Sequence, residues 1–378
     1  MIFTEYIMNI RGLLKHRNAL YGLLAIWIVC FHVSISVRFP TSSYTISHFI
    51  KATLKQSDVP FNGLLKLFSQ FLSSGNLAVD VFMLLSGVCL YLSFERRYGD
   101  GKIEFFSYFK KRISRVVVPY LVIALPYWAW VSVIRAKHSF FDFPRFIWNY
   151  SSASFWFGNS RKAWFAIAIM LFYLLFPLIF KLVKKHTALG FVMLAVIYVG
   201  GYFLCKSPAE NISIAVTRLP SFVIGAMLAK HIDALDLKRL PEAVRGIVVF
   251  LSFIAVLLGT AFFPIHSVAK KNSLPHYAVW YTYGLLAVCF IIVMVWICGK
   301  VERFYFEKTL SFIGSLSLEI YLVHTMTLGV MGYYHVDKKF GVLLFPMMLA
   351  WGILGGYLAS LATKLILKPF EHKKALKH

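Results

Sequence analysis

The sequence is poor in charged residues, and above all in acidic ones. Only 15% of its 378 residues are charged, and 16 Asp and Glu stand against 40 Lys and Arg. A soluble domain normally has about a quarter charged residues, so this composition argues against a soluble protein. The basic residues are spread through short segments and form no single patch. The net charge of +24 therefore does not indicate a nucleic-acid-binding protein.

Cysteine is also scarce, and the sequence has no Cys-x-x-Cys spacing. The five cysteines lie in or at the ends of apolar blocks, so we expect free thiols and neither a disulfide framework nor a metal site. Internal repeats, low-complexity segments and a separate polar region are missing as well. We therefore expect one domain over residues 1–378, with no appended soluble domain.

What the chain has in abundance is apolar sequence. Hydrophobic residues make up 59% of it, its mean hydropathy is +0.70, and the apolar residues form blocks of about 20. This pattern predicts an all-α integral membrane protein, a polytopic bundle of about ten transmembrane helices. The expected spans are 19–38, 75–94, 116–134, 164–182, 187–204, 213–231, 246–264, 276–298, 309–331 and 341–366.

The distribution of Lys and Arg predicts the orientation of this bundle. With the N-terminus in the cytoplasm, the cytoplasmic segments hold the larger share of these residues, including the dense cluster FKKRISR. An even number of spans then places the C-terminus in the cytoplasm too. The first apolar block follows a basic N-terminus but lacks a small-residue cleavage site, so we interpret it as a retained span.

Four ionisable residues fall inside the expected spans, where such residues are costly and are candidates for function. Counted from the expected outer ends of their helices, all four lie roughly 7–10 Å below the outer surface. If their faces point inward, they line one outward-leaning cavity. They are His32, Asp80, Arg218 and His324.

Each of these residues also has a structural explanation. His32 and His324 are the kind of buried histidine that hydrogen-bonds to a neighbouring helix. Asp80 is equally explained as the partner of Arg218 or of another buried cation, because an unpaired carboxylate there is costly. Arg218 alone is explained as an interfacial anchor that extends outward.

Helical spacing groups further residues around the four. Ser86 and Gly87 are adjacent small residues on the second span, and small residues allow another helix to approach closely. On the ninth span, Ser317, Tyr321 and His324 form a polar stripe on one face.

Two arginines lie at the cytoplasmic start of the third span. Arg112 and Arg115 are spaced i and i+3 before VVVPY, and guanidinium groups match the oxygen geometry of phosphates. The alternative is ordinary anchoring of a basic cytoplasmic segment.

Several of these motifs resemble one known family. GNLAVDVFMLLSG, RISRVVVPY and AWFAIAIMLFYLLFP resemble signatures of the bacterial membrane acyltransferase-3 family, and TRLPSFVIG and IGSLSLEIYLVH resemble its later ones. The matches occur in order from span one to span nine. Together they cover most of the chain.

The first span departs from the family pattern, which has an arginine eleven residues before the histidine. Tyr21 occupies that position here. Arg17 lies one helical turn before Tyr21 on the same face, and we hypothesise that it supplies the missing cation.

The resemblance implies a bacterial inner or plasma membrane enzyme that transfers acyl groups, usually acetyl, from acyl-CoA to sugar hydroxyls. Acceptors would be a cell-envelope polysaccharide or its lipid-linked precursor, and the oligomeric state stays open. His32 would be the general base, and Asp80 would orient it. The candidate residues for oxyanion or acceptor contacts are Arg218, His324, Tyr321 and Trp164. Arg112, Arg115 and Arg17 would bind acyl-CoA.

Other chemistry and other functions stay open at this stage. One open alternative is a covalent acyl-histidine or acyl-cysteine intermediate. The cysteine form is disfavoured because Cys30 lies on another face of the helix than His32. A transporter or flippase also places charged groups inside a bundle, and often has internal repeats and broken helices. Pro220 could break the sixth span in this way. A third alternative, suggested by Tyr21, is a protein that kept the fold and lost catalysis.

Overall fold

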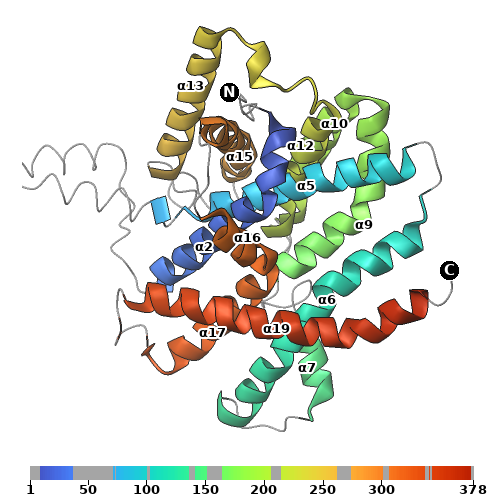
Figure 1. The fold of residues 1–378 in the computed structure, drawn as a ribbon. Helices are drawn as coiled ribbons and strands as arrows, with labels where there is room; N and C mark the ends of the chain where they lie inside the picture. Colours follow the sequence, from blue (N-terminus) through green and yellow to red (C-terminus); the bar gives the residue numbers. More distant parts are fainter. Residues whose placement is uncertain are drawn as a thin grey trace, which may run out of the picture.

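A computed structural model describes residues 9–36, 71–72, 74–99, 103–135, 141–150, 164–205, 214–261, 274–300, 306–336, 340 and 343–375. The main elements of these ranges are α-helices (Figure 1). They are α1 (Ile10–Leu13), α2 (Arg17–Ser36), α5 (Asn76–Tyr98), α6 (Phe105–Trp130), α7 (Phe143–Tyr150), α9 (Trp164–Lys185), α10 (Thr187–Cys205), α12 (Leu219–Lys230), α13 (Glu242–Ala261), α15 (Leu274–Lys300), α16 (Glu307–Ser315), α17 (Ser317–Tyr333) and α19 (Leu344–Ala375).

Length and hydropathy identify seven helices in the described ranges that are able to cross a membrane. An eighth span is obtained when α16 and α17 are taken together, although they meet at a bend of 67°. The expectation of an all-α, multi-pass membrane protein is therefore confirmed. The two remaining expected spans contain α10 and the short α12, so the total of ten, like the orientation of the termini, stays a prediction.

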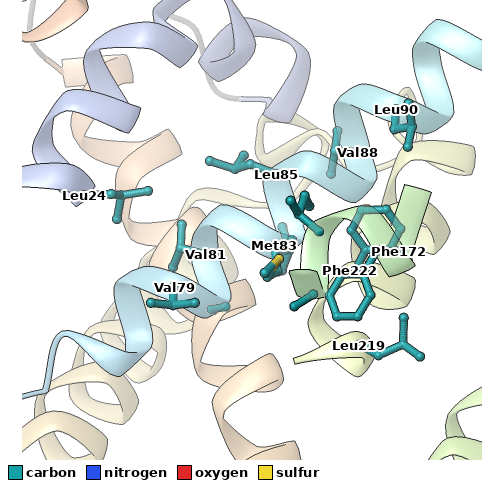
Figure 2. Packing of buried hydrophobic residues seen from close by; sticks show 14 of the residues in the cluster. Leu24, Val79, Val81, Met83, Leu85, Val88, Leu90, Phe172, Leu219 and Phe222 are labelled. Carbon is teal, nitrogen blue, oxygen red and sulfur yellow. The ribbon is translucent and has the colours of Figure 1, made fainter. Parts of the chain in front are cut away.

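The helix α5 lies at the centre of the apolar core. It is buried on most sides, as expected for a helix that is apolar around its circumference. Figure 2 shows its residues Val79 and Met83 among side chains from other helices, such as Leu24 of α2 and Phe222 of α12. In Figure 1, α6 lies between α9 and α19 and packs against both.

Two helix contacts are close because glycines form them. A Cβ atom on Gly87 would lie 2.1 Å from the Phe222 carbonyl oxygen, and one on Gly225 would lie 2.0 Å from the Leu84 carbonyl oxygen. The close approach expected at Gly87 is therefore present, between α5 and α12. Gly314 makes a similar contact with Asn18, which brings α16 against α2.

We predict that Gly225→Ala lowers the stability of the protein by about 1–3 kcal/mol, because the added methyl group forces α5 and α12 apart. The matched control is Gly246→Ala on α13, where a Cβ atom meets nothing within 4 Å. The control should be neutral or slightly stabilising, since alanine favours helices over glycine. Thermal unfolding of the purified proteins in detergent measures both. Equal midpoints for the two variants would contradict the close contact.

The sixth expected span is interrupted, as Pro220 suggested. The chain turns at Thr217 and Arg218, and α12 begins at Leu219 with Pro220 in its first turn. Proline is tolerated there because the first amides of a helix have no intrahelical acceptor. Arg218 thus lies at the N-cap of α12.

Candidate active site

The two predicted histidines come together from opposite ends of the sequence. Nδ1 of His32, on α2, lies 2.9 Å from Nε2 of His324, on α17. Nδ1 of His324 lies 2.7 Å from the carbonyl oxygen of Ile320, one turn earlier in the same helix. His324 is fully buried, whereas His32 is half-buried. The two residues therefore form a hydrogen-bonded dyad across the α2–α17 contact.

A cavity of about 210 Å³ lies beside this dyad. The polar stripe expected on the ninth span is confirmed, because Ser317, Tyr321 and His324 all line the cavity. The other residues around it are Tyr21, Ala25, Ile28, Val79, Phe82, Ser86, Val116, Phe165, Ile169, Tyr173 and Leu318.

One wall of the cavity is aromatic. The ring of Tyr321 lies 5.6 Å from that of His324 and 5.0 Å from that of Phe165. Trp164, a predicted contact residue, packs edge-on against Phe165 at 5.9 Å. The sequence reasoning missed Phe165 and Phe82, because phenylalanine is too common in this chain to signal a site.

Asp80 and Arg218 form a second polar cluster. The Arg218 guanidinium is salt-bridged to Asp80, whose other oxygen accepts a hydrogen bond of 2.7 Å from the Ser221 hydroxyl. Nη2 of Arg218 also lies 3.3 Å from the side-chain oxygen of Asn76. Both charged side chains are buried, 0% and 2% exposed. The contacts are those of the structural explanation, in which Asp80 is the partner of Arg218.

The expectation that all four ionisable residues line one cavity needs correction. Among the described residues, His324 lines it, while His32, Asp80 and Arg218 do not, and His32 adjoins the cavity through its contact with His324. Similar depth does not fix the direction of a side chain, and the charges of this pair are turned toward each other. Asp80 contacts Arg218 and Ser221, at the start of α12, so among the described residues no direct contact with His32 supports its predicted orienting role.

Tyr21, which replaces the family's arginine, contributes to the cavity wall. Its ring stacks on Phe82, with centroids 5.0 Å apart and planes inclined by 13°. Arg17 begins α2 and is exposed, with its Nε 3.4 Å from the Asn18 side-chain oxygen. That Arg17 supplies the cation missing at position 21 stays a hypothesis.

A basic pocket of about 560 Å³ lies where α5 ends and α6 begins. The predicted Arg112 and Arg115 line it, and so do three cations that the sequence reasoning did not select, Arg96, Arg97 and Lys111. The Arg-Arg pair that closes the second span is the signal for Arg96 and Arg97, and the FKKRISR cluster is the signal for Lys111. Ser93, Phe94, Tyr98 and Tyr108 complete the lining.

Tyr173 connects the basic pocket with the cavity. It lines the cavity, and the Arg112 guanidinium lies 5.7 Å from its ring centroid. The hydroxyl of Tyr108, in the basic pocket, donates a hydrogen bond of 3.0 Å to the Tyr173 carbonyl. The two hollows are thus neighbours across one residue.

The chain is similar in sequence to several known proteins. Proteins of Staphylococcus aureus strains COL, MSSA476 and MRSA252, each named "Putative O-acetyltransferase", are 24% identical to the chain over 334 residues. The match covers 81% of this chain and 54% of each relative, so the chain spans about half the length of these relatives. No solved structure matches.

The family described as "Acyltransferase domain" matches residues 18–365, which include the dyad, the cavity and the basic pocket. This match extends over most of the described helices. The chain belongs to the acyltransferase-3 family.

Proposed function

We propose that this protein is a membrane-embedded O-acyltransferase that moves an acyl group, most simply acetyl, from cytoplasmic acyl-CoA to a hydroxyl of a cell-surface polysaccharide or its lipid-linked precursor. The observation that carries the proposal is the His32–His324 dyad beside a cavity that adjoins a basic pocket. The name of the S. aureus relatives supports the same reaction class.

The basic pocket suits the phosphate-bearing end of acyl-CoA. Arginine forks bind phosphate oxygens well, and the pocket gathers five basic side chains. The thioester would then extend past Tyr173 into the cavity, whose wall is partly apolar. Arg17, at the start of α2, stays a further proposed cation for binding acyl-CoA. The other proposed partner of the protein is the membrane lipid around it.

In the proposed reaction, His32 removes the proton of the acceptor hydroxyl through Nε2 as the hydroxyl oxygen attacks the thioester carbonyl carbon. The new C–O bond forms a tetrahedral intermediate. Its collapse breaks the C–S bond, and the coenzyme A thiolate takes the proton back from His32. Every atom is accounted for, and the protein ends in its starting state. The acceptor would enter near GNSRKAW, a segment that lies largely outside the described residues.

Comparison of surface polysaccharide from cells with and without the gene tests the proposed function. Mass spectrometry should find O-acyl groups that disappear on deletion and return when the gene is restored. The mass increment identifies acetyl, succinyl or a longer group. Identical polysaccharide in the two strains would contradict the proposal.

For the donor site, we predict that Arg112→Ala with Arg115→Ala weakens binding of coenzyme A by roughly 10-fold or more. Each charge-assisted hydrogen bond is worth about 1.5–3 kcal/mol, and 1.4 kcal/mol corresponds to tenfold. Calorimetric titration of the purified protein measures the effect. Exposed Arg239, outside this pocket, provides the control Arg239→Ala. An unchanged affinity in the double variant would mean that the two arginines only anchor the segment.

One observation keeps the transporter alternative in view. The α16–α17 pair is bent by 67°, and broken helices of this kind occur in transporters. The two functions separate experimentally, because a transporter variant loses export of the glycan, whereas an acyltransferase variant exports a glycan that lacks acyl groups.

A further inference from the structure

We propose that His324 is a positioning residue that fixes the tautomer of His32 and places the lone pair of His32 on Nε2, the nitrogen that acts as the base. The tautomer assignment follows from the geometry of the dyad. Its consequence for catalysis rests on the proposed function.

The assignment begins at the Ile320 carbonyl. A carbonyl oxygen only accepts hydrogen bonds, so the Nδ1 of His324 that lies 2.7 Å away must carry a proton. In a neutral imidazole the other nitrogen then has a lone pair. Nε2 of His324 is therefore an acceptor, and its partner 2.9 Å away, Nδ1 of His32, must donate. The lone pair of His32 is left on Nε2.

The surroundings favour the neutral form of His324 that this assignment needs. The side chain is 0% exposed, and both of its hydrogen-bond partners, a carbonyl and an imidazole, are uncharged groups. A buried charge without a counter-ion is costly.

The bend between α16 and α17 holds the dyad in place. The close contact of Gly314 with Asn18 fixes α16 against α2, and α17 starts directly after the bend and also packs on α2. The N-terminal end of α17 is therefore held against α2, and α17 carries His324 to His32. Its orientation is fixed further by Ile320 within α17.

This role differs from the oxyanion contact that the sequence suggested for His324. With Nδ1 donating to Ile320 and Nε2 accepting from His32, no N–H of a neutral His324 remains for an oxyanion. The arrangement supports His32 during the reaction instead. When His32 takes a proton on Nε2, its Nδ1–H still donates to His324, and a charged donor strengthens that hydrogen bond.

Nuclear magnetic resonance of ¹⁵N-histidine-labelled protein in nanodiscs tests the tautomer directly. The His32 signals are assigned by their loss in His32→Gln. In the unmodified protein we expect the proton of neutral His32 on Nδ1. A proton on Nε2 would overturn the proposal, and this experiment needs neither an active protein nor a known acceptor.

Variants of His324 test the consequence. Leucine fills similar space without an acceptor, whereas glutamine keeps a carbonyl oxygen that accepts from His32. For His324→Leu we expect kcat to fall roughly 10- to 100-fold with little change in KM for acetyl-CoA, by analogy with the loss of partners that orient metal-binding imidazoles. His324→Gln should recover most of the rate, and exposed His186→Gln should keep all of it.

The outcomes separate this inference from the proposed function. Equal rates for the leucine and glutamine variants, or a leucine variant that raises KM alone, would overturn the positioning role. If the predicted tautomer is found but the polysaccharide carries no acyl groups, the geometry of the dyad stands and the proposed function fails.

Discussion

Replacement of His32 by glutamine is expected to reduce O-acylation of surface polysaccharide by roughly 10²–10⁴-fold, the usual contribution of a general base. Glutamine has a similar size and can still hydrogen-bond with His324, but it cannot accept a proton from a hydroxyl at working pH. The variant should therefore fold, enter the membrane and still bind coenzyme A. Mass spectrometry of the polysaccharide, with the protein level measured in the same cells, gives the result.

The control for this experiment is His186→Gln, an exposed histidine outside the dyad, which should acylate normally. Glycan export is measured alongside. Loss of acylation with normal export is the result that the account requires. Loss of export would favour a transporter, and full acylation by His32→Gln would remove His32 from the chemistry.

Replacement of Asp80 by alanine is expected to give the second large effect, a loss of about 3–5 kcal/mol of stability, because it leaves the charge of Arg218 buried without its partner. The double variant Asp80→Leu with Arg218→Met removes both charges and should regain much of this stability. Thermal unfolding in detergent measures each protein. The matched control is Asp233→Ala, which breaks an exposed salt bridge of 2.9 Å with Arg11 and should cost less than about 1 kcal/mol.

Activity of the double variant decides between the two roles considered for Asp80. A stable and active double variant assigns the pair to structure. A stable but inactive one assigns Asp80 or Arg218 to the reaction. A single Asp80→Ala variant as stable as the control would contradict the burial of the pair itself.

Much of the helical framework could be predicted from the sequence, because lipid-spanning helices require long apolar stretches that hydropathy detects directly. The pairing of Asp80 with Arg218 was among the alternatives for a related reason. Two opposite charges inside an apolar bundle are strongly driven together. The stripe of Ser317, Tyr321 and His324 followed from helical periodicity alone.

The remaining features depend on which helices become neighbours, and sequence periodicity carries little of that information. The similar depth of Asp80 and His32 in their spans predicted that the two side chains lie together. The glycine contacts instead join α5 to α12, where Asp80 pairs with Arg218. The dyad required α17 to lie on α2, which depends on the bend after α16. Tyr173 links the two hollows through contacts with residues of another helix.

The most direct test of the central claim is acyl transfer by the purified protein in lipid vesicles. Acetyl-CoA labelled in the acetyl group is supplied with polysaccharide from the deletion strain, which lacks the acyl groups this protein would add. The account predicts that label passes to the polysaccharide with the unmodified protein and that His32→Gln transfers roughly 10²–10⁴-fold more slowly. Label that stays in acetyl-CoA with the unmodified protein, or that His32→Gln transfers equally fast, would contradict it.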